Sequence, residues 1–254
     1  MTKKNNIEVC FSPALYPSYE NPEANVIIVD ILRATTSITN AFINGVEKII
    51  PVSGREEALK MKKKGFIVAA PDVNNTGETK FKFRNPNPIN YGSVLIGRSI
   101  VGVQAGDVVR IINYLKTRED VDKEKIGGLA IAEMTPTLLH AAAFDPSVNS
   151  IMLLKPLISY KSIVLNKYYE FPFTCCVAGA LTSYDLPDLT GSISPRKVVL
   201  VEINDQLKHP ASEELVNEEM AFPQKTYSLK NASGNLKILP NEKDMNSVID
   251  WCFK

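Results

Sequence analysis

The feature that most constrains this chain is the alternation of short apolar runs with segments of helical periodicity. Apolar runs at residues 7–11, 26–29 and 66–70 are typical of strands, and residues 34–44 have the apolar spacing of a helix. The pattern resumes with strands expected at residues 125–132, 150–154 and 197–203. Parallel strands joined by crossover helices produce this order. The sequence therefore predicts an α/β fold, with a mostly parallel sheet and helices on both faces.

Two stretches interrupt the alternation. Residues 73–93 are rich in Asn, Pro, Gly and Lys and have no sustained period, which predicts a long loop. Residues 155–190 are expected to form an irregular insertion between two strands, and they contain Tyr160 and Tyr184. An apolar helix is expected at residues 138–144, and a closing helix is expected around Val248.

Composition narrows the function classes. The chain has 254 residues, of which 44% are hydrophobic and 22% charged, as expected for a single α/β domain covering residues 1–254. Its net charge of +1 comes from interspersed charges, so we expect no nucleic-acid partner. No signal-peptide core or long apolar run is found, which predicts a cytoplasmic protein with no membrane partner. A small-molecule ligand is expected, and a homo-oligomer is left open.

The first candidate site follows the apolar run at residues 26–29. Asp30, Arg33, Thr35 and Thr36 lie where a strand is expected to end and a helix to begin, which is where ligands bind in open α/β sheets. Backbone N–H groups at the helix start would bind an anion together with Arg33, Thr35 and Thr36, and Asp30 could hold Mg²⁺. The alternative is structural, with Asp30 or Thr35 capping the helix and Arg33 solvated.

The opening of the chain resembles a known family. Residues 7–64, above all residues 26–36, 44–45 and 49–52, are similar to the start of the 2-phosphosulfolactate phosphatases. The resemblance implies a Mg²⁺-dependent phosphatase with Asp30 as a catalytic and metal-binding residue. It covers only the first part of the chain, and the family's later glycine-rich stretches have no recognisable counterpart after Gly65.

The rest of the chain resembles a different family. Residues 71–79, 95–102, 137–145 and 184–189 are similar to the α/β-hydrolase modules of acetyl-xylan-esterase-like proteins, which implies a three-layer sandwich. In that fold the nucleophilic serine follows a strand in a sharp turn. Here the strand at residues 128–132 leads into Glu133, Met134 and Thr135, with Met134 at the place expected for serine. A thioether cannot attack a carbonyl, and a shift of register offers only Glu133 or Thr135.

The other two members of a Ser-His-Asp triad are also doubtful. Asp205 follows the strand at residues 197–203 and is placed to be the acid. His209 comes only four residues later, too early for the base. His140 falls in the apolar helix, where a buried core histidine is favoured over a catalytic one. These residues predict a hydrolase-fold protein with a degenerate triad, weakly active or non-catalytic, that binds a small acyl or sugar-like ligand or acts as a scaffold.

The two resemblances meet at residues 62–66, where a helix is expected to lead into a strand. This seam predicts a fusion, natural or recombined, in which both parts contribute to one continuous sheet. Three functions are open from the sequence: the degenerate hydrolase-fold protein, a Mg²⁺-dependent phosphatase acting on a phosphorylated sulfonate such as 2-phosphosulfolactate, and an inactive fusion or scaffold.

Overall fold

The computed structural model describes residues 69, 71–80, 87–241 and 245–253. Asp30, Arg33, Thr35, Thr36 and the seam at residues 62–66 lie outside the described residues, so the predictions about them stay predictions. The chain divides into two compact units, one formed by Met1–Asp72 with Thr76–Thr79 and the other by Val73–Asn75 with Lys80–Lys254. In the first unit the described part includes the short 3-10 helix η2 (Gly77–Thr79). All the following elements belong to the second unit.

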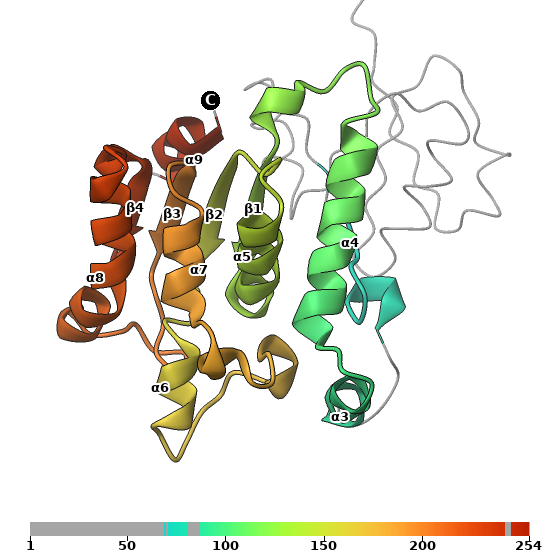
Figure 1. Ribbon diagram of the computed structural model, residues 1–254, viewed down its shortest axis with the longest axis vertical. Helices are drawn as coiled ribbons and strands as arrows, with labels where there is room; N and C mark the ends of the chain where they lie inside the picture. The colour runs from blue at the N-terminus through green and yellow to red at the C-terminus, as the bar shows by residue number, and fades with distance from the viewer. Residues whose placement is uncertain (1–68, 70, 81–86, 242–244, 254) are drawn as a thin grey trace, which may run out of the picture. The chain divides into compact units, whose positions relative to one another are not determined.

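The described sheet is fully parallel. Its strands β1 (Gly127–Ile131), β2 (Ser150–Leu154), β3 (Lys197–Val201) and β4 (Leu236–Leu239) lie in this order across the sheet (Figure 1). After their first residues, Ser150 and Lys197, strands β2 and β3 are continuous apolar runs that are buried along nearly their whole length, as expected for central strands covered on both faces. The predicted α/β class and the three predicted strands in this part are confirmed. All four residues of strand β4 are half-buried, so polar and apolar residues do not alternate clearly along it.

Helices cover both faces of this sheet. On one face, α5 (Thr135–Phe144), α7 (Leu186–Ser192) and α8 (Glu213–Leu229) lie side by side, with α4 (Ile100–Leu115) next to α5 (Figure 1). Their apolar side chains form one core with Ile151, Leu153, Val198 and Leu200. On the opposite face, Val248 and Cys252 of α9 (Met245–Phe253) pack against Met152 and Val199. Alternate residues of β2 and β3 therefore face different layers, as the pleat requires.

Two sequence expectations need correction. The long loop expected at residues 73–93 ends early, because α3 occupies Asn87–Leu95. The stretch expected to be irregular contains α6 (Tyr160–Val164) and the start of α7, together with the 3-10 helices η5 (Phe173–Cys175) and η6 (Ala180–Thr182). These helices are too short for a hydrophobic period to reveal them. Within the described residues, no helix is long and apolar enough to cross a membrane.

The C-terminal end of α5 is held by Arg196, which lies immediately before β3. Its half-buried guanidinium donates hydrogen bonds to the carbonyl oxygens of Ala142 (2.7 Å), Val148 (2.7 Å) and Asp145 (3.1 Å). Unpaired carbonyls and the negative end of the helix dipole both favour a cation at this position. The contact fixes α5, whose first residues form the candidate site, relative to the central sheet.

Candidate functional site

Three neighbouring strands turn sharply at their carboxyl ends. Ala132, Lys155 and Glu202 directly follow β1, β2 and β3, and all three have left-handed backbone angles, with φ of 48°, 53° and 52°. The register pairs Ile131 with Leu154 and Leu154 with Val201, so the three turns lie along one edge. Non-glycine residues rarely adopt this conformation, and ligands in open α/β folds bind outside the carboxyl ends of strands. We call this region the carboxyl edge.

The bend after β1 lies in the 3-10 helix η4 (Ala132–Met134), which leads directly into α5. Its left-handed residue is Ala132, whereas Met134 has right-handed helical angles. A nucleophilic serine occupies the strained residue of such a turn. Neither the methyl group of Ala132 nor the thioether of Met134 supplies an attacking oxygen. The Thr135 hydroxyl is buried and donates to the Ala132 carbonyl oxygen at 2.7 Å, so it is engaged within the turn.

Glu133 forms an ion pair across this edge. Its Oε1 atom lies 2.5 Å from Nζ of Lys208, in the loop after β3. The hydrogen bond from Lys208 holds the pKa of Glu133 below its ordinary value. The Lys208 ammonium also lies over the ring of Phe171, 5.5 Å from its centroid. Glu133 is therefore an ionised carboxylate with a cationic partner, which disfavours it as a general acid.

A thiol approaches the same turn from the η5 segment. Sγ of Cys175 donates to the Glu133 carbonyl oxygen at 3.4 Å, and the side chain is almost fully buried. Burial raises the pKa of the Cys175 thiol to about 12. A nucleophilic cysteine requires a thiolate, and so this thiol is suited to packing rather than attack. Sequence spacing gave no signal for this contact, because Cys175 and Glu133 are far apart in the chain.

Asp205, the predicted acid, closes its own loop. Its Oδ1 atom accepts backbone N–H groups from Leu207 (2.8 Å) and His209 (3.0 Å), and its own N–H donates to the His209 carbonyl oxygen. Asp205 therefore bonds the backbone of His209, whose side chain is exposed. This is the arrangement of an Asx turn.

His140 belongs to the core. Its Nδ1 lies 2.6 Å from the Pro136 carbonyl oxygen, which can only accept, so Nδ1 donates and Nε2 accepts from the Tyr184 hydroxyl at 3.0 Å. Burial lowers the pKa of His140 and favours the neutral imidazole. Both ring nitrogens are satisfied, which matches the core histidine favoured by the sequence.

A second ion pair completes the carboxyl edge. Nζ of Lys155 lies 3.6 Å from Oε2 of Glu202, so the side chains of two left-handed residues face each other. Together with Glu133 and Lys208, the edge has two carboxylates matched by two ammonium groups. In the described part of the chain, no group of three or more His, Cys, Asp or Glu residues could hold a metal ion. The Mg²⁺ prediction therefore depends on Asp30, outside the described residues.

Comparison with known proteins separates the two parts of the chain. Residues 10–85 match the family model of 2-phosphosulpholactate phosphatase. Among curated proteins, the probable 2-phosphosulfolactate phosphatase of Thermotoga maritima is 28% identical over 115 residues, which cover 37% of this chain and 50% of that protein. The 2-phosphosulfolactate phosphatase of Methanothermobacter thermautotrophicus is 33% identical over 119 residues, 42% of this chain and 51% of that protein. The chain thus spans about half the length of these relatives.

The fold has a different neighbour. A crystal structure from Bacteroides fragilis, provisionally assigned as an acetyl xylan esterase, superposes with a TM-score of 0.58 at 17% identity. The match covers 81% of this chain and 56% of that chain, and it shows a shared fold. Both resemblances predicted from the sequence are therefore confirmed: a phosphatase-like opening and an esterase-like fold.

Proposed function

We propose that the chain is an α/β-hydrolase-fold protein whose esterase-type triad is degenerate, with weak or no covalent catalysis. The observation that carries this proposal is the bend after β1. Ala132 and Met134 have no nucleophilic oxygen there, and the Thr135 hydroxyl is buried and bonded to the backbone. Without a nucleophile and a base beside it, only binding and electrostatic stabilisation remain available for catalysis.

The charges of the carboxyl edge favour a neutral ligand. Each ammonium group there faces a carboxylate, Lys208 with Glu133 and Lys155 with Glu202. Matched pairs leave little net field for an ionic ligand, while their oxygens and N–H groups can still hydrogen-bond hydroxyl or carbonyl groups. A small acyl or sugar-like molecule fits this chemistry.

An ester-hydrolysis assay on the whole chain tests this proposal. Aryl acetate is supplied without metal, and turnover close to that of buffer is expected. A rate well above buffer that is lost in Asp205→Ala or Glu133→Gln, but kept in Asp30→Ala, would locate a working centre at the carboxyl edge and overturn the proposal. Circular dichroism of each variant separates lost chemistry from lost folding.

A second candidate is favoured by the family match at residues 10–85. In this alternative, Asp30 holds Mg²⁺ and Arg33, Thr35 and Thr36 bind the phosphate of a phosphorylated sulfonate such as 2-phosphosulfolactate. Phosphate release from 2-phosphosulfolactate is measured with and without Mg²⁺. Metal-dependent release that disappears in Asp30→Ala supports the phosphatase, whereas unchanged turnover in that variant removes Asp30 from the mechanism. If neither ester reacts above buffer, the phosphatase is excluded, and a hydrolase-fold protein that binds a ligand or acts as a scaffold is favoured.

A further inference from the structure

A groove of about 640 Å³ lies on the surface between α6, α7 and α8, and neither Glu133 nor Lys208 lines it. Its apolar lining includes four side chains that are unusually exposed for their type. Val164 and Leu165 at the end of α6 are 70% and 71% exposed, while Leu181 and Phe222 are 44% and 52% exposed. Scattered apolar residues on a surface need no explanation, but a contiguous group lining a depression marks an interaction site.

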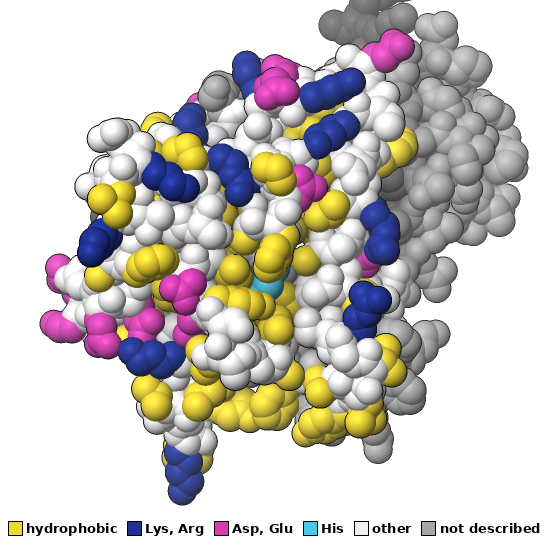
Figure 2. Space-filling view, in the orientation of Figure 1, with side chains coloured by type: hydrophobic (Ala, Val, Ile, Leu, Met, Phe, Trp, Pro, Cys, Tyr) yellow, Lys and Arg dark blue, Asp and Glu magenta, His cyan; other side chains and the backbone are white. Residues whose placement is uncertain are grey.

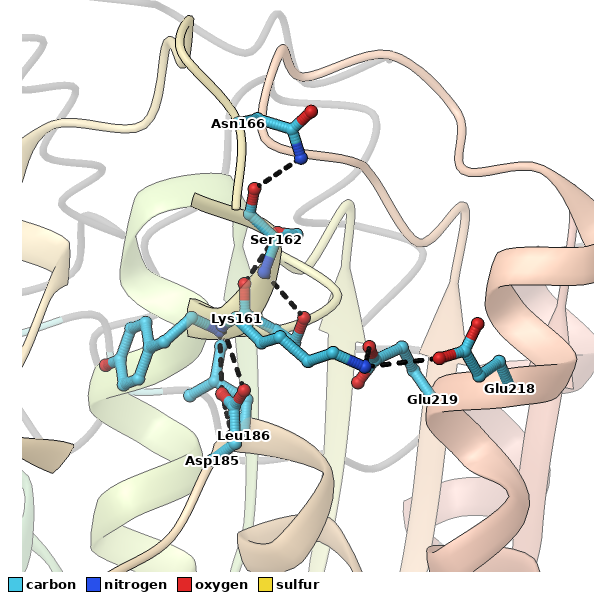
Figure 3. Close-up of polar contacts among 9 residues, drawn as sticks. Lys161, Ser162, Asn166, Asp185, Leu186, Glu218 and Glu219 are labelled. Atoms are coloured by element: carbon cyan, nitrogen blue, oxygen red, sulfur yellow. Dashed lines mark hydrogen bonds and ion pairs between the residues drawn. The ribbon is translucent and has the colours of Figure 1, made fainter. Parts of the chain in front are cut away.

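The walls of the groove are held in place by Asp185. Its carboxylate accepts backbone N–H groups from Tyr160 (2.6 Å) and Lys161 (3.0 Å) of α6 and from Leu186 (2.6 Å) of α7 (Figure 3). Its own N–H donates to Oδ2 of Asp188 at 2.8 Å, which completes a capping box on α7. One carboxylate thus joins the first turns of two helices.

A lysine of α6 connects this helix to α8, which forms the third wall of the groove. Nζ of Lys161 lies 3.1 Å from carboxylate oxygens of both Glu218 and Glu219 on α8 (Figure 3). These contacts hold α6 and α8 together while the apolar side chains between them stay exposed. The groove is therefore formed in the free protein, and a ligand would not have to order it.

The negative charge of the groove indicates the sign of the charge on its partner. Four carboxylates line it, those of Asp185, Asp188, Glu218 and Glu219, against the single ammonium of Lys161. Figure 2 shows acidic side chains gathered where Figure 1 draws α6 and the start of α8, with hydrophobic side chains beside them. In a two-fold dimer the same patch faces itself, so these acids would meet acids. A second copy of the chain is therefore disfavoured, and a positively charged partner is favoured.

We propose that this groove binds a basic, amphipathic segment of another protein. Apolar side chains of that segment pack on Leu165, Leu181 and Phe222, while its Lys or Arg side chains pair with Glu218 and Asp188. Recognition of this kind places an apolar helix face in a groove and uses charges at the rim for orientation. The proposal does not depend on whether the carboxyl edge has any catalytic activity.

Fluorescence anisotropy with the whole chain tests the proposal. The probe is a labelled helical peptide of Leu and Lys with its leucines on one face, and the control peptide has Glu in place of Lys. We expect the Lys peptide to bind, with affinity falling as salt rises, and the Glu peptide not to bind.

Matched variants locate the binding. Leu165→Ser should weaken binding about tenfold, since a leucine contact is lost. Leu229→Ser, equally exposed at 75% but outside the groove, should leave binding unchanged. Glu218→Gln should weaken binding about threefold, whereas Glu214→Gln, on the same helix but outside the groove, should not. All four positions are exposed, so the variants should fold.

Three results would overturn the proposal. Equal weakening by Leu165→Ser and Leu229→Ser, or equal binding of both peptides, would mean that the groove does not select this partner. Concentration-dependent self-association in sedimentation experiments, abolished by Leu165→Ser, would assign the groove to a second copy of the chain.

Discussion

Replacing Arg196 by alanine should destabilise the second unit more than removing an exposed surface charge such as Arg110. The guanidinium donates to three carbonyl oxygens at the end of α5 and the loop that follows it, at 2.7–3.1 Å, and to the Ile193 carbonyl oxygen at 3.3 Å. Ala142 and Val148, which supply two of these carbonyl oxygens, are themselves buried. The substitution therefore leaves several half-buried acceptors to find water or stay unpaired.

The magnitude follows from these contacts. A hydrogen bond to a charged group contributes about 1.5–3 kcal/mol, and the four bonds share one guanidinium, so their contributions do not add fully. Burial lowers the pKa of Arg196, which reflects a desolvation cost that offsets part of the gain. We expect the free energy of unfolding to fall by about 2–4 kcal/mol in Arg196→Ala. The stability of Arg196→Lys should lie between those of the unmodified chain and Arg196→Ala, because one ammonium group cannot reach carbonyl oxygens that lie in several directions.

Urea unfolding followed by circular dichroism measures this change. With an m-value of about 3 kcal/mol/M, the midpoint should fall by about 1 M. Arg110→Ala is the control, since that side chain is 76% exposed and pairs only across one helical turn with Asp107; it should cost less than about 1 kcal/mol. If Arg196→Ala changed stability no more than Arg110→Ala, the carbonyl contacts would not be what anchors α5.

Three further predictions concern the stability of the second unit. Burial lowers the pKa of His140, so below about pH 6.5 the unfolded chain binds a proton at this residue that the folded chain does not. The free energy of unfolding should therefore decrease as pH falls below 6.5, by up to about 1.4 kcal/mol per pH unit. The substitution His140→Gln should remove this pH dependence, whereas His209→Gln should not. The pKa of Glu133 is lowered in the folded state, so its pair with Lys208 should stabilise the fold above pH 4.5, and this contribution should disappear as pH falls below 4.5. Because the pair is partly exposed, Glu133→Gln should lower the free energy of unfolding by less than about 1 kcal/mol in urea titrations at pH 7. A methyl group on Gly128 would lie 2.5 Å from Cδ1 of Leu138, so Gly128→Ala should lower the melting temperature by the equivalent of about 1–3 kcal/mol, while Gly234→Ala, with open space around it, should not.

The local pattern predicted the fold better than the site. After their first residues, β2 and β3 are apolar throughout, which is the pattern expected of strands buried on both faces. The short helices α6 and α7 escaped prediction, because five or seven residues do not establish a period. They form through capping by Ser159 and Asp185, and Asp185 caps both.

The candidate site divides in the same way. That Ala132 and Met134 have no nucleophilic oxygen can be read directly from the sequence. That the Thr135 hydroxyl and the Asp205 carboxylate are engaged with the backbone cannot, because those bonds depend on the path of the turns.

The sequence by itself determined the class of the fold and the chemical groups available at the bend after β1, since apolar periodicity and side-chain identity are local properties. Only the tertiary structure decided which of those groups meet. Lys208 reaches Glu133, Cys175 reaches the same turn, and Lys161 joins α6 to α8, all between segments far apart in the chain. Such pairs are selected by how whole helices and strands pack, and no spacing along the chain encodes that packing.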